Sequence, residues 1–244
     1  MTTLFMSDFH IGSPLFEYRN LFDILTSPKY DEVFLLGDIF DVWEDDFDDI
    51  VNDNISIFEI LTKLSAKKPV HFVRGNHDPS VEEIKRFLPN LIFADRLKNK
   101  NNEYSRYHGT EFNKGIVLHG ELFDDLVAKY LWFSKFLFLF QKFFERVFRF
   151  NIQEFLRESF FSVSNKSDKE YFLDLIGDIE DATINKYQGA YPFLIMGHTH
   201  YPKHITFDQD VNGANKFTYI NCGDWISNHT YVTHDDNDGF ILHR

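Results

Sequence analysis

The sequence contains very little cysteine, since Cys222 is the only one among 244 residues. A single thiol excludes an internal disulfide and a cysteine-rich structural zinc site, and it favours a reducing compartment. The first residues also lack positive charge, because residues 2–6 carry no basic leader before Ser7 and Asp8. We therefore expect no export signal and a cytoplasmic protein.

Other features are missing along the chain. There is no internal repeat and no low-complexity linker, so we expect one domain over residues 1–244. In the most aromatic segment of the chain, the longest stretch without a charged residue is far shorter than the roughly 20 residues needed to span a bilayer. Any membrane contact would therefore be peripheral. The apolar fraction of 43% is ordinary for a globular protein and argues against disorder.

Basic residues are outnumbered, with 25 Lys and Arg against 38 Asp and Glu and a formal net charge of −13. A net-negative surface repels a nucleic-acid backbone, so we expect no nucleic-acid partner. Most of the acidic excess serves solubility. The remainder gathers near polar motifs that follow the expected strands, where bound cations would offset it.

Six short apolar runs have the length and composition of strands, and each ends in a polar turn. They cover residues 3–6, 32–36, 70–73, 115–118, 193–196 and 217–220. Helix-like segments lie between them at 55–66 and 80–87, and the second opens with the capping-box pair Ser80 and Glu83. Residues 230–243 predict a closing hairpin. The pattern predicts an α/β (α+β) fold with its chemistry on loops at strand ends.

One long segment does not follow this alternation of strands and helices. From Glu121 to about Gln188 no pattern predicts a strand, and aromatic residues are concentrated there. We expect a helical aromatic and basic insertion at about 121–188. At roughly 100° per residue, four cations fall within about 60° of one another, opposite a broad apolar arc. They are Lys135, Lys142, Arg146 and Arg149. Such a helix suits a membrane interface or an acyl-chain groove, and a buried or dimerising helix with snorkelling cations is an equal alternative.

Residues of metal-binding type follow the expected strands in a fixed order. Asp8 and His10 form an Asp-x-His motif, and alternation along a strand would place both on one side. The other members are Asp38, Asn76, His77, Asp78, His119, His198 and His200. Imidazole, carboxylate and carbonyl oxygen together suit divalent metals of the Mn²⁺, Fe²⁺ and Zn²⁺ group. Each motif alone is weak, but the ordered set is specific.

The ordered set resembles the calcineurin-like metallophosphoesterases, and the resemblance covers the chain apart from the insertion. It implies two packed mixed β-sheets flanked by helices, and two divalent metal ions, with Mn²⁺ as the expected ion. By this resemblance, one metal would be held by Asp8, His10, Asp38 and His200. The other would be held by Asp38, Asn76, His119 and His198, so that Asp38 bridges the two.

The resemblance also implies two catalytic residues. His77 would face the substrate phosphate and donate a hydrogen bond or a proton, with Asp78 holding its imidazole. The two cations would activate a bridging hydroxide and offset charge on the phosphoryl oxygens during in-line attack. Arg74 could reach the same phosphate, and a structural ion pair is an equal alternative.

Three stretches narrow the resemblance to the UDP-2,3-diacylglucosamine diphosphatases of the lipid A pathway. They are residues 37–46, residues 119–125 and residues 221–225. This resemblance implies hydrolysis of the diphosphate of UDP-2,3-diacylglucosamine to UMP and 2,3-diacylglucosamine 1-phosphate. Asp124 and the four cations of the insertion would contact the substrate. The protein would lie in the cytoplasm, with a peripheral position on the inner membrane.

Some positions differ from that pattern. His77 and Tyr201 stand where arginine is usual, and Glu121 stands where aspartate is usual. Arginine can hold a phosphate bidentately and tyrosine cannot, so a soluble phosphodiesterase or phosphatase acting on nucleotides or other small phosphoesters stays an alternative. A metal-binding scaffold without turnover is less favoured, because such scaffolds commonly lose a ligand or the histidine. The oligomeric state stays open.

Three further residues have a structural interpretation beside a functional one. Asp41 belongs to an acidic run that is expected to form a solvated loop. Trp225 and Asp224 belong to a stretch that carries the narrower resemblance, but they could equally pack beneath the site and cap a turn.

Overall fold

The computed structural model describes the chain except for residues 19, 44, 95, 99–103, 124–165 and 209–215. It divides into two compact units, one formed by Met1–Glu121 with Ile184–Arg244 and the other by Leu122–Thr183. The first unit holds both sheets and all the metal-binding motifs. The expected substrate contacts of the insertion lie outside the described residues. These contacts are Asp124, Lys135, Lys142, Arg146 and Arg149.

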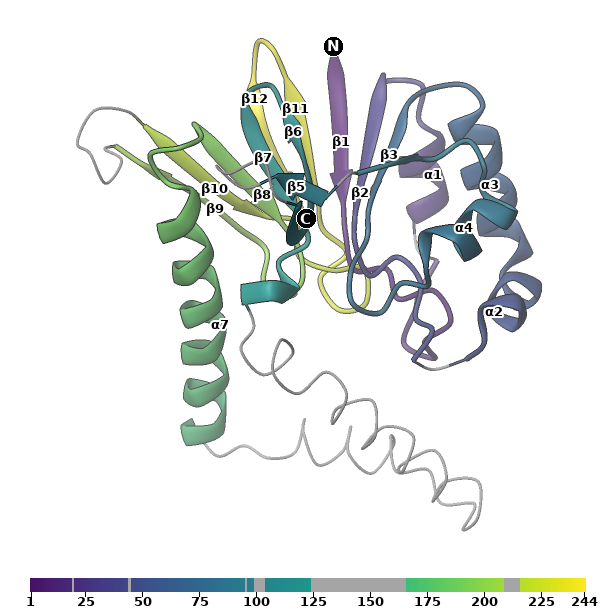
Figure 1. Ribbon diagram of the computed structural model, residues 1–244, viewed down its shortest axis with the longest axis horizontal. Coiled ribbons are helices and arrows are strands. Elements are labelled where there is room, and N and C mark those ends of the chain that lie inside the picture. The colour runs from purple at the N-terminus through teal and green to yellow at the C-terminus, as the bar shows by residue number, and fades with distance from the viewer. Residues whose placement is uncertain (19, 44, 95, 99–103, 124–165, 209–215) are drawn as a thin grey trace. The chain divides into compact units, whose positions relative to one another are not determined.

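Six strands form the first sheet, in the order β12-β11-β1-β2-β3-β4 (Figure 1). They are β1 (Thr2–Met6), β2 (Glu32–Leu36), β3 (Val70–Val73), β4 (Ile92–Phe93), β11 (Tyr231–Asp235) and β12 (Gly239–His243). Strands β1 to β4 are parallel, whereas β11 pairs antiparallel with both β1 and β12. The closing hairpin is therefore confirmed, and it extends the sheet beside its first strand.

Four helices cover one face of this sheet (Figure 1). They are α1 (Leu21–Thr26), α2 (Phe47–Asp53), α3 (Ile55–Ser65) and α4 (Val81–Phe87). Alternation along β1 sends Leu4 and Met6 into the core shared with these helices and Phe5 to the opposite face. The capping box is confirmed, because Ser80 Oγ accepts from the Glu83 N–H and the Glu83 carboxylate accepts from the Ser80 N–H.

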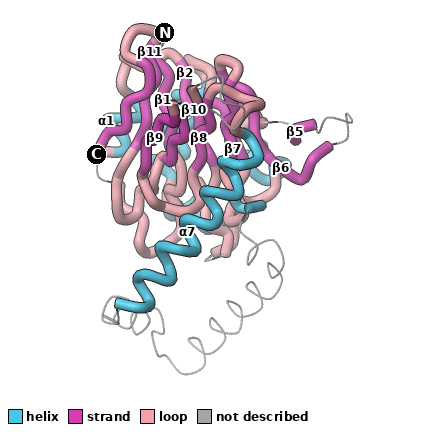
Figure 2. Tube along the Cα trace, turned by 90° about the vertical axis from the view of Figure 1, so that its left-hand side faces the viewer, coloured by secondary structure: helices cyan, strands magenta, loops and turns pink. Residues whose placement is uncertain are grey.

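The second sheet has the strand order β5-β6-β7-β8-β10-β9 (Figure 2). Its strands are β5 (Arg96–Lys98), β6 (Tyr104–Phe112), β7 (Gly115–Leu118), β8 (Phe193–Met196), β9 (Lys203–Phe207) and β10 (Phe217–Asn221). Strands β7, β8 and β10 are parallel, and antiparallel neighbours flank them. Both sheets are therefore mixed, as the resemblance implied.

The remaining described elements are the short turn η1 (Glu121–Phe123) and helix α7 (Lys166–Tyr187). All six predicted apolar runs form strands, but strands β4, β5, β6 and β9 and helices α1 and α2 are not predicted. Strand β9 shows why. It lies at an edge of its sheet, and His204, Ile205 and Thr206 are all exposed, so no apolar run marks it.

Aromatic side chains fill the space between the two sheets. Phe5 stacks on Phe34 with ring centroids 5.0 Å apart and meets the edge of Phe112 at 5.1 Å. Phe193 and Ile195 of β8 belong to the same buried cluster. This cluster fixes the parallel strands of one sheet against those of the other, and so it fixes the loops at their ends.

Truncating the inter-sheet core is expected to destabilise the chain strongly. Phe5 has an exposed fraction of 0%, so Phe5→Ala should lower the free energy of unfolding by about 3–5 kcal/mol. Urea unfolding followed by fluorescence measures the loss. Ile241→Ala on β12, where the side chain is 42% exposed, is the control and should cost less than about 1 kcal/mol. Equal losses in the two variants would contradict this core.

Candidate metal centre

Seven expected metal ligands lie in loops that follow the strands of both sheets. The loops after the parallel strands β1, β2 and β3 carry four of them, and those after β7 and β8 carry the other three. The ligands are Asp8, His10, Asp38, Asn76, His119, His198 and His200. Because parallel strands end at the same edge of a sheet, these loops meet although they are far apart in the sequence.

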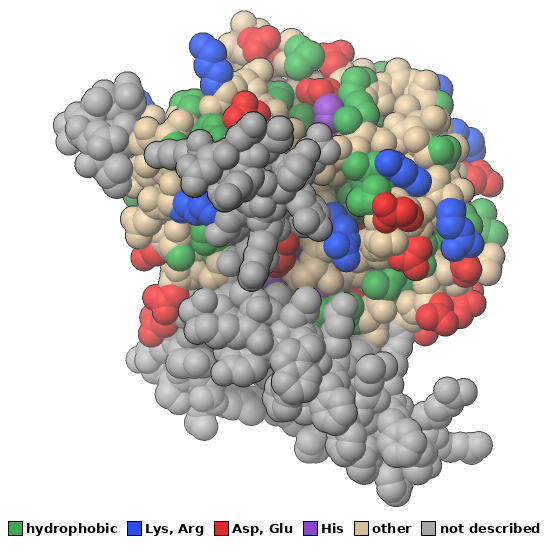
Figure 3. Space-filling view, in the orientation of Figure 1, with side chains coloured by type: hydrophobic (Ala, Val, Ile, Leu, Met, Phe, Trp, Pro, Cys, Tyr) green, Lys and Arg blue, Asp and Glu red, His purple; other side chains and the backbone are tan. Residues whose placement is uncertain are grey.

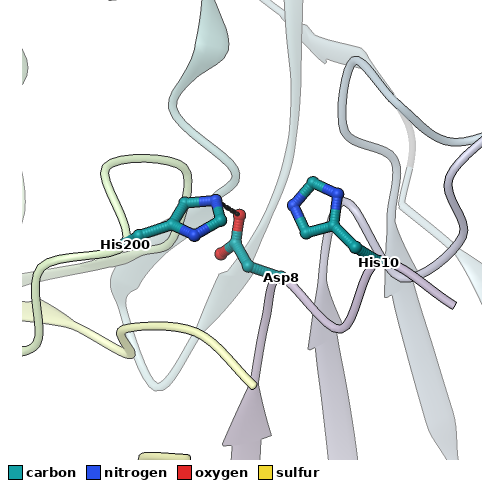
Figure 4. Close-up of side chains that lie close together, drawn as sticks. All are labelled: Asp8, His10 and His200. Atoms are coloured by element: carbon teal, nitrogen blue, oxygen red, sulfur yellow. Dashed lines mark ion pairs between the residues drawn. The ribbon is translucent and has the colours of Figure 1, made fainter. Parts of the chain in front are cut away.

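The first group of ligands comprises Asp8, His10 and His200. Each offers one ligand atom, and these atoms lie within 4.8 Å of one another. Figure 4 shows the Asp8 carboxylate between the two imidazoles, with Nε2 of His200 3.3 Å from Asp8 Oδ1. Asp8 and His10 follow β1 rather than lie in it, at φ angles of 54° and 52°. The expectation that strand alternation brings them together is therefore wrong, because a left-handed turn does so.

The second group comprises Asp38, His119 and His198, whose ligand atoms also lie within 4.8 Å of one another. Nδ1 of His119 donates to the Leu36 carbonyl at 2.8 Å, so Nε2 faces Asp38 Oδ2 at 3.2 Å. The same Asp38 oxygen lies 3.9 Å from Nε2 of His10 in the first group. Asp38 therefore lies between the two groups, which is the position that a bridging carboxylate needs.

Several ligand atoms are buried without a hydrogen bond. Asp8 Oδ1, His10 Nε2, Asn76 Oδ1 and His119 Nε2 bond to none of the residues that the structure describes. Two of these atoms face an opposite charge without a hydrogen bond, Asp8 Oδ1 beside His200 Nε2 and His119 Nε2 beside Asp38 Oδ2. Burial of a polar atom without a hydrogen bond costs free energy, so such atoms indicate room for a further partner. Imidazole nitrogens with carboxylate and amide oxygens suit Mn²⁺, Fe²⁺ or Zn²⁺. The residues therefore fit a pair of divalent cations.

Backbone strain gathers in the same loops. Eight non-glycine residues in the described ranges have positive φ, and five of them are expected ligands. The five are Asp8, His10, Asp38, His198 and His200. A side chain held in this region costs on the order of 1–3 kcal/mol, so strain concentrated on ligands indicates a functional constraint.

Two glycines allow the ligand loops to approach one another. A Cβ atom on Gly37, whose φ is +85°, would lie 2.5 Å from the ring of His119. A Cβ atom on Gly75 would lie 2.2 Å from Asp38 Oδ1. Both separations are far below van der Waals contact, so these two loops require glycine.

Buried charges of both signs face one another at this site. Burial raises the pKa of the Asp38 carboxyl, but the imidazoles of His119, His77 and His10 together outweigh burial and hold that pKa well below its usual value. Burial lowers the pKa of His200, yet the carboxylates of Asp8 and Asp224 raise it to about 10. Both effects show that anionic carboxylates hold positive charge at this point, as a cation site requires.

The imidazole of His77 is held by Asp41. Nδ1 of His77 donates to Asp41 Oδ1 at 2.9 Å, and Nδ1 of His10 donates to Asp41 Oδ2 at 3.0 Å. The indole of Trp43 stacks on His77 with ring centroids 4.2 Å apart. Asp41 is only 5% exposed, so its interpretation as part of a solvated loop is wrong. One carboxylate orients both an expected ligand and the expected catalytic histidine.

Asp78 has a different role from the one expected. Its carboxylate accepts backbone N–H groups of Asp38, Phe40 and Gly75 at 2.8–2.9 Å. It therefore ties the loops after β2 and β3 together, and the expected pairing with the imidazole of His77 is wrong. Burial and then the charge of Asp38 raise the pKa of Asp78 to about 7. We infer a structural role for this side chain.

Two other residues of interest lie beside the ligands. Arg74 donates to the backbone carbonyls of Pro79 and Asp78, which closes the loop after β3. These bonds go to backbone carbonyls rather than to an acidic side chain, and the phosphate contact stays a prediction. Tyr201 directly follows His200 and is 45% exposed, with Nζ of Lys203 5.3 Å from the centre of its ring.

Comparisons with known proteins agree with this geometry. The family model for calcineurin-like phosphoesterase matches residues 1–202. The chain is 30% identical to the UDP-2,3-diacylglucosamine hydrolase of Vibrio parahaemolyticus serotype O3:K6, covering 99% of this chain and 97% of that protein. It is 26% identical to the UDP-2,3-diacylglucosamine hydrolase of Shewanella baltica strain OS223, covering 92% and 90%. Among the described helices, none has the length and hydropathy to cross a membrane.

Divalent metal is expected to stabilise the folded chain, because it supplies the partner that the buried ligand atoms lack. A site filled at 100 times its dissociation constant adds about 2.7 kcal/mol to the free energy of unfolding. Titrating Mn²⁺ into chelator-treated protein should therefore raise the midpoint of thermal unfolding, followed by scanning fluorimetry.

His119→Ala should remove most of this rise. His71→Ala is the matched control, because His71 is a half-buried histidine outside the site that pairs with Glu32 at 2.8 Å. The control should keep the rise, although its own midpoint falls. A rise of equal size in both variants would argue against a metal site at His119.

Proposed function

The chain belongs to the calcineurin-like phosphoesterase family, and from this premise we propose that it hydrolyses the diphosphate of UDP-2,3-diacylglucosamine. The products would be UMP and 2,3-diacylglucosamine 1-phosphate. The observation that carries the proposal is the group of buried ligand atoms around Asp38 that make no hydrogen bond within the described part of the chain. Relatives named UDP-2,3-diacylglucosamine hydrolase, which align over nearly their whole length, support the substrate.

The cation pair is proposed to be Mn²⁺. One cation would be held by Asp8, His10, Asp38 and His200, and the other by Asp38, Asn76, His119 and His198. Such a pair lowers the pKa of bound water and offsets charge on the phosphoryl oxygens. The protein would supply the fixed ligand geometry, which the strained loops and the two close glycines hold.

The contribution of the chain itself to catalysis would centre on His77. Asp41 holds Nδ1 of this residue, and Trp43 stacks on one face of its ring, so both the direction and the plane of the imidazole are fixed. Nε2 is then the nitrogen that would donate a hydrogen bond or a proton to the phosphate or the leaving oxygen. Asp41 also holds His10, so the proton donor and one ligand share a single support.

The acyl chains of the proposed substrate call for an apolar surface. A helix over the insertion would offer one, because it would place Lys135, Lys142, Arg146 and Arg149 in a stripe opposite a broad aromatic arc. Asp124 would be a further substrate contact. On the face shown in Figure 3, acidic and basic side chains are interspersed over the described surface. We therefore propose the insertion as the peripheral contact with the inner membrane, on its cytoplasmic side.

Chelator-treated protein supplied with Mn²⁺ is expected to release UMP from UDP-2,3-diacylglucosamine, followed by phosphorus NMR with and without detergent. Asp38→Ala should abolish release, because both cations would lose a shared ligand. Asp236→Ala, at an aspartate that pairs with the N-terminus on the surface, should leave it unchanged. Mn²⁺-dependent cleavage of bis(p-nitrophenyl) phosphate without any UMP would overturn the substrate and favour a small phosphoester instead.

Removing the proposed proton donor is expected to slow turnover without loss of metal. His77→Ala should lower the turnover number by about 10²–10⁴, the usual contribution of general acid–base catalysis. Bound Mn²⁺, counted after equilibrium dialysis, should stay at the wild-type level, because His77 is outside the ligand set. His71→Ala again serves as the control. A turnover number equal to that of the wild type would remove His77 from the chemistry.

A further inference from the structure

The end of β10 and the loop that follows it, together residues 221–230, make hydrogen bonds to the loop that carries Asp8. Ser7 Oγ donates to the Gly223 carbonyl at 2.9 Å, and the Trp225 N–H donates to the Asp8 carbonyl at 3.0 Å. The family model ends at residue 202, so these contacts come from a part of the chain outside the family match.

The same loop supports the loop that carries His200. Asn221 Nδ2 donates to the Gly197 carbonyl at 3.0 Å and to Thr199 Oγ1 at 2.9 Å. Asn228 Nδ2 donates to the backbone carbonyl of His200 at 2.9 Å. Strand β10 runs parallel to β8, so the ends of these two strands bring both loops to one edge of the sheet.

Asp224 is the buried carboxylate at the centre of this loop, with an exposed fraction of 2%. Its Oδ1 atom accepts the backbone N–H groups of Ile226, Ser227 and Asn228 at 2.9, 2.6 and 3.0 Å. Its Oδ2 atom accepts from Asn228 Nδ2 at 2.8 Å and lies 3.4 Å from Nδ1 of His200. One oxygen therefore caps the turn, and the other faces the imidazole.

We propose that Asp224 is a positioning residue that presents Nε2 of His200 to a cation. This inference rests on the proposed function, because it presupposes the metal pair. The imidazole lies between two carboxylates, with Nε2 3.3 Å from Asp8 Oδ1 and Nδ1 facing Asp224. With Nδ1–H directed at Asp224, the lone pair of Nε2 stays available to a metal.

The orientation of the His200 imidazole depends on a hydrogen-bond acceptor more than the orientations of His10 and His119 do. Its side chain is 35% exposed, whereas those of His10 and His119 are 7% and 0% exposed. Close packing immobilises the two buried imidazoles, in addition to the hydrogen bonds that their Nδ1 atoms make to Asp41 and Leu36. A partly exposed imidazole keeps rotational freedom, so its orientation depends on the acceptor at Nδ1.

Turn capping alone does not account for a carboxylate at this position. An asparagine could accept the same three backbone N–H groups through Oδ1, as Asx turns commonly do. Only the second oxygen requires an acid, because it faces two side-chain nitrogens, Asn228 Nδ2 at 2.8 Å and His200 Nδ1 at 3.4 Å. Asp224→Asn therefore keeps the cap and turns the acceptor that faces His200 into a donor.

Isothermal titration of chelator-treated protein with Mn²⁺ tests the inference. In Asp224→Asn, the dissociation constant of one of the two Mn²⁺ ions should rise about 10–100-fold, and that of the other should stay at its wild-type value. Thr230→Val is the matched control, because it removes a buried hydrogen bond to the Cys222 carbonyl in the same loop without contact to His200. The control should unfold at a lower temperature and bind both ions with wild-type affinity.

The outcomes separate the inference from the function on which it rests. A wild-type chain that binds no Mn²⁺ would overturn the proposed function and this inference with it. A wild-type chain that binds two ions, together with unchanged affinities in Asp224→Asn, would overturn the inference alone. An equal loss of affinity for both ions in Asp224→Asn, or the same loss in Thr230→Val, would mean that Asp224 only caps the turn. Either result would overturn the positioning role.

Discussion

The burial of two carboxylates is the constraint on which the rest of this structure depends. Asp8 and Asp38 are 0% and 2% exposed, and both are held in their anionic form by neighbouring imidazoles. An isolated anion in such a place would cost many kcal/mol, so positive charge must lie within a few ångströms. The histidines supply part of it, and the ligand atoms that make no hydrogen bond within the described residues mark where the proposed cations would supply the rest.

The fold meets this constraint by bringing the ends of two sets of parallel strands together. Three loops of the first sheet and two of the second carry the ligands, and the aromatic core around Phe5 and Phe34 fixes one sheet against the other. Glycine at positions 37 and 75 lets these loops approach closely. Five expected ligands have a left-handed backbone conformation. Backbone strain is therefore tolerated where it directs a side chain toward the site.

Sequence patterns revealed the parts of this arrangement that are local. Apolar runs marked six strands. The order of the motifs marked seven expected ligands, and the structure brings six of them into two groups. The partners of those ligands were not visible, because they depend on which loops meet in space. Asp41 looked like one member of a solvated acidic run, and it is the buried support of His10 and His77. Asp78 was adjacent to His77 in the chain, yet its carboxylate points to the backbone of another loop.

The partners of the histidines also distinguish the two halves of the proposed metal site. Nδ1 of His10 and of His200 faces a carboxylate, whereas Nδ1 of His119 donates to a neutral carbonyl. A carboxylate makes an imidazole more basic and adds negative charge close to its metal, and a carbonyl does so far less. The half built from Asp8, His10 and His200 would therefore attract a cation more strongly. The segment after residue 202 would then adjust a proposed metal site whose expected ligands all precede it.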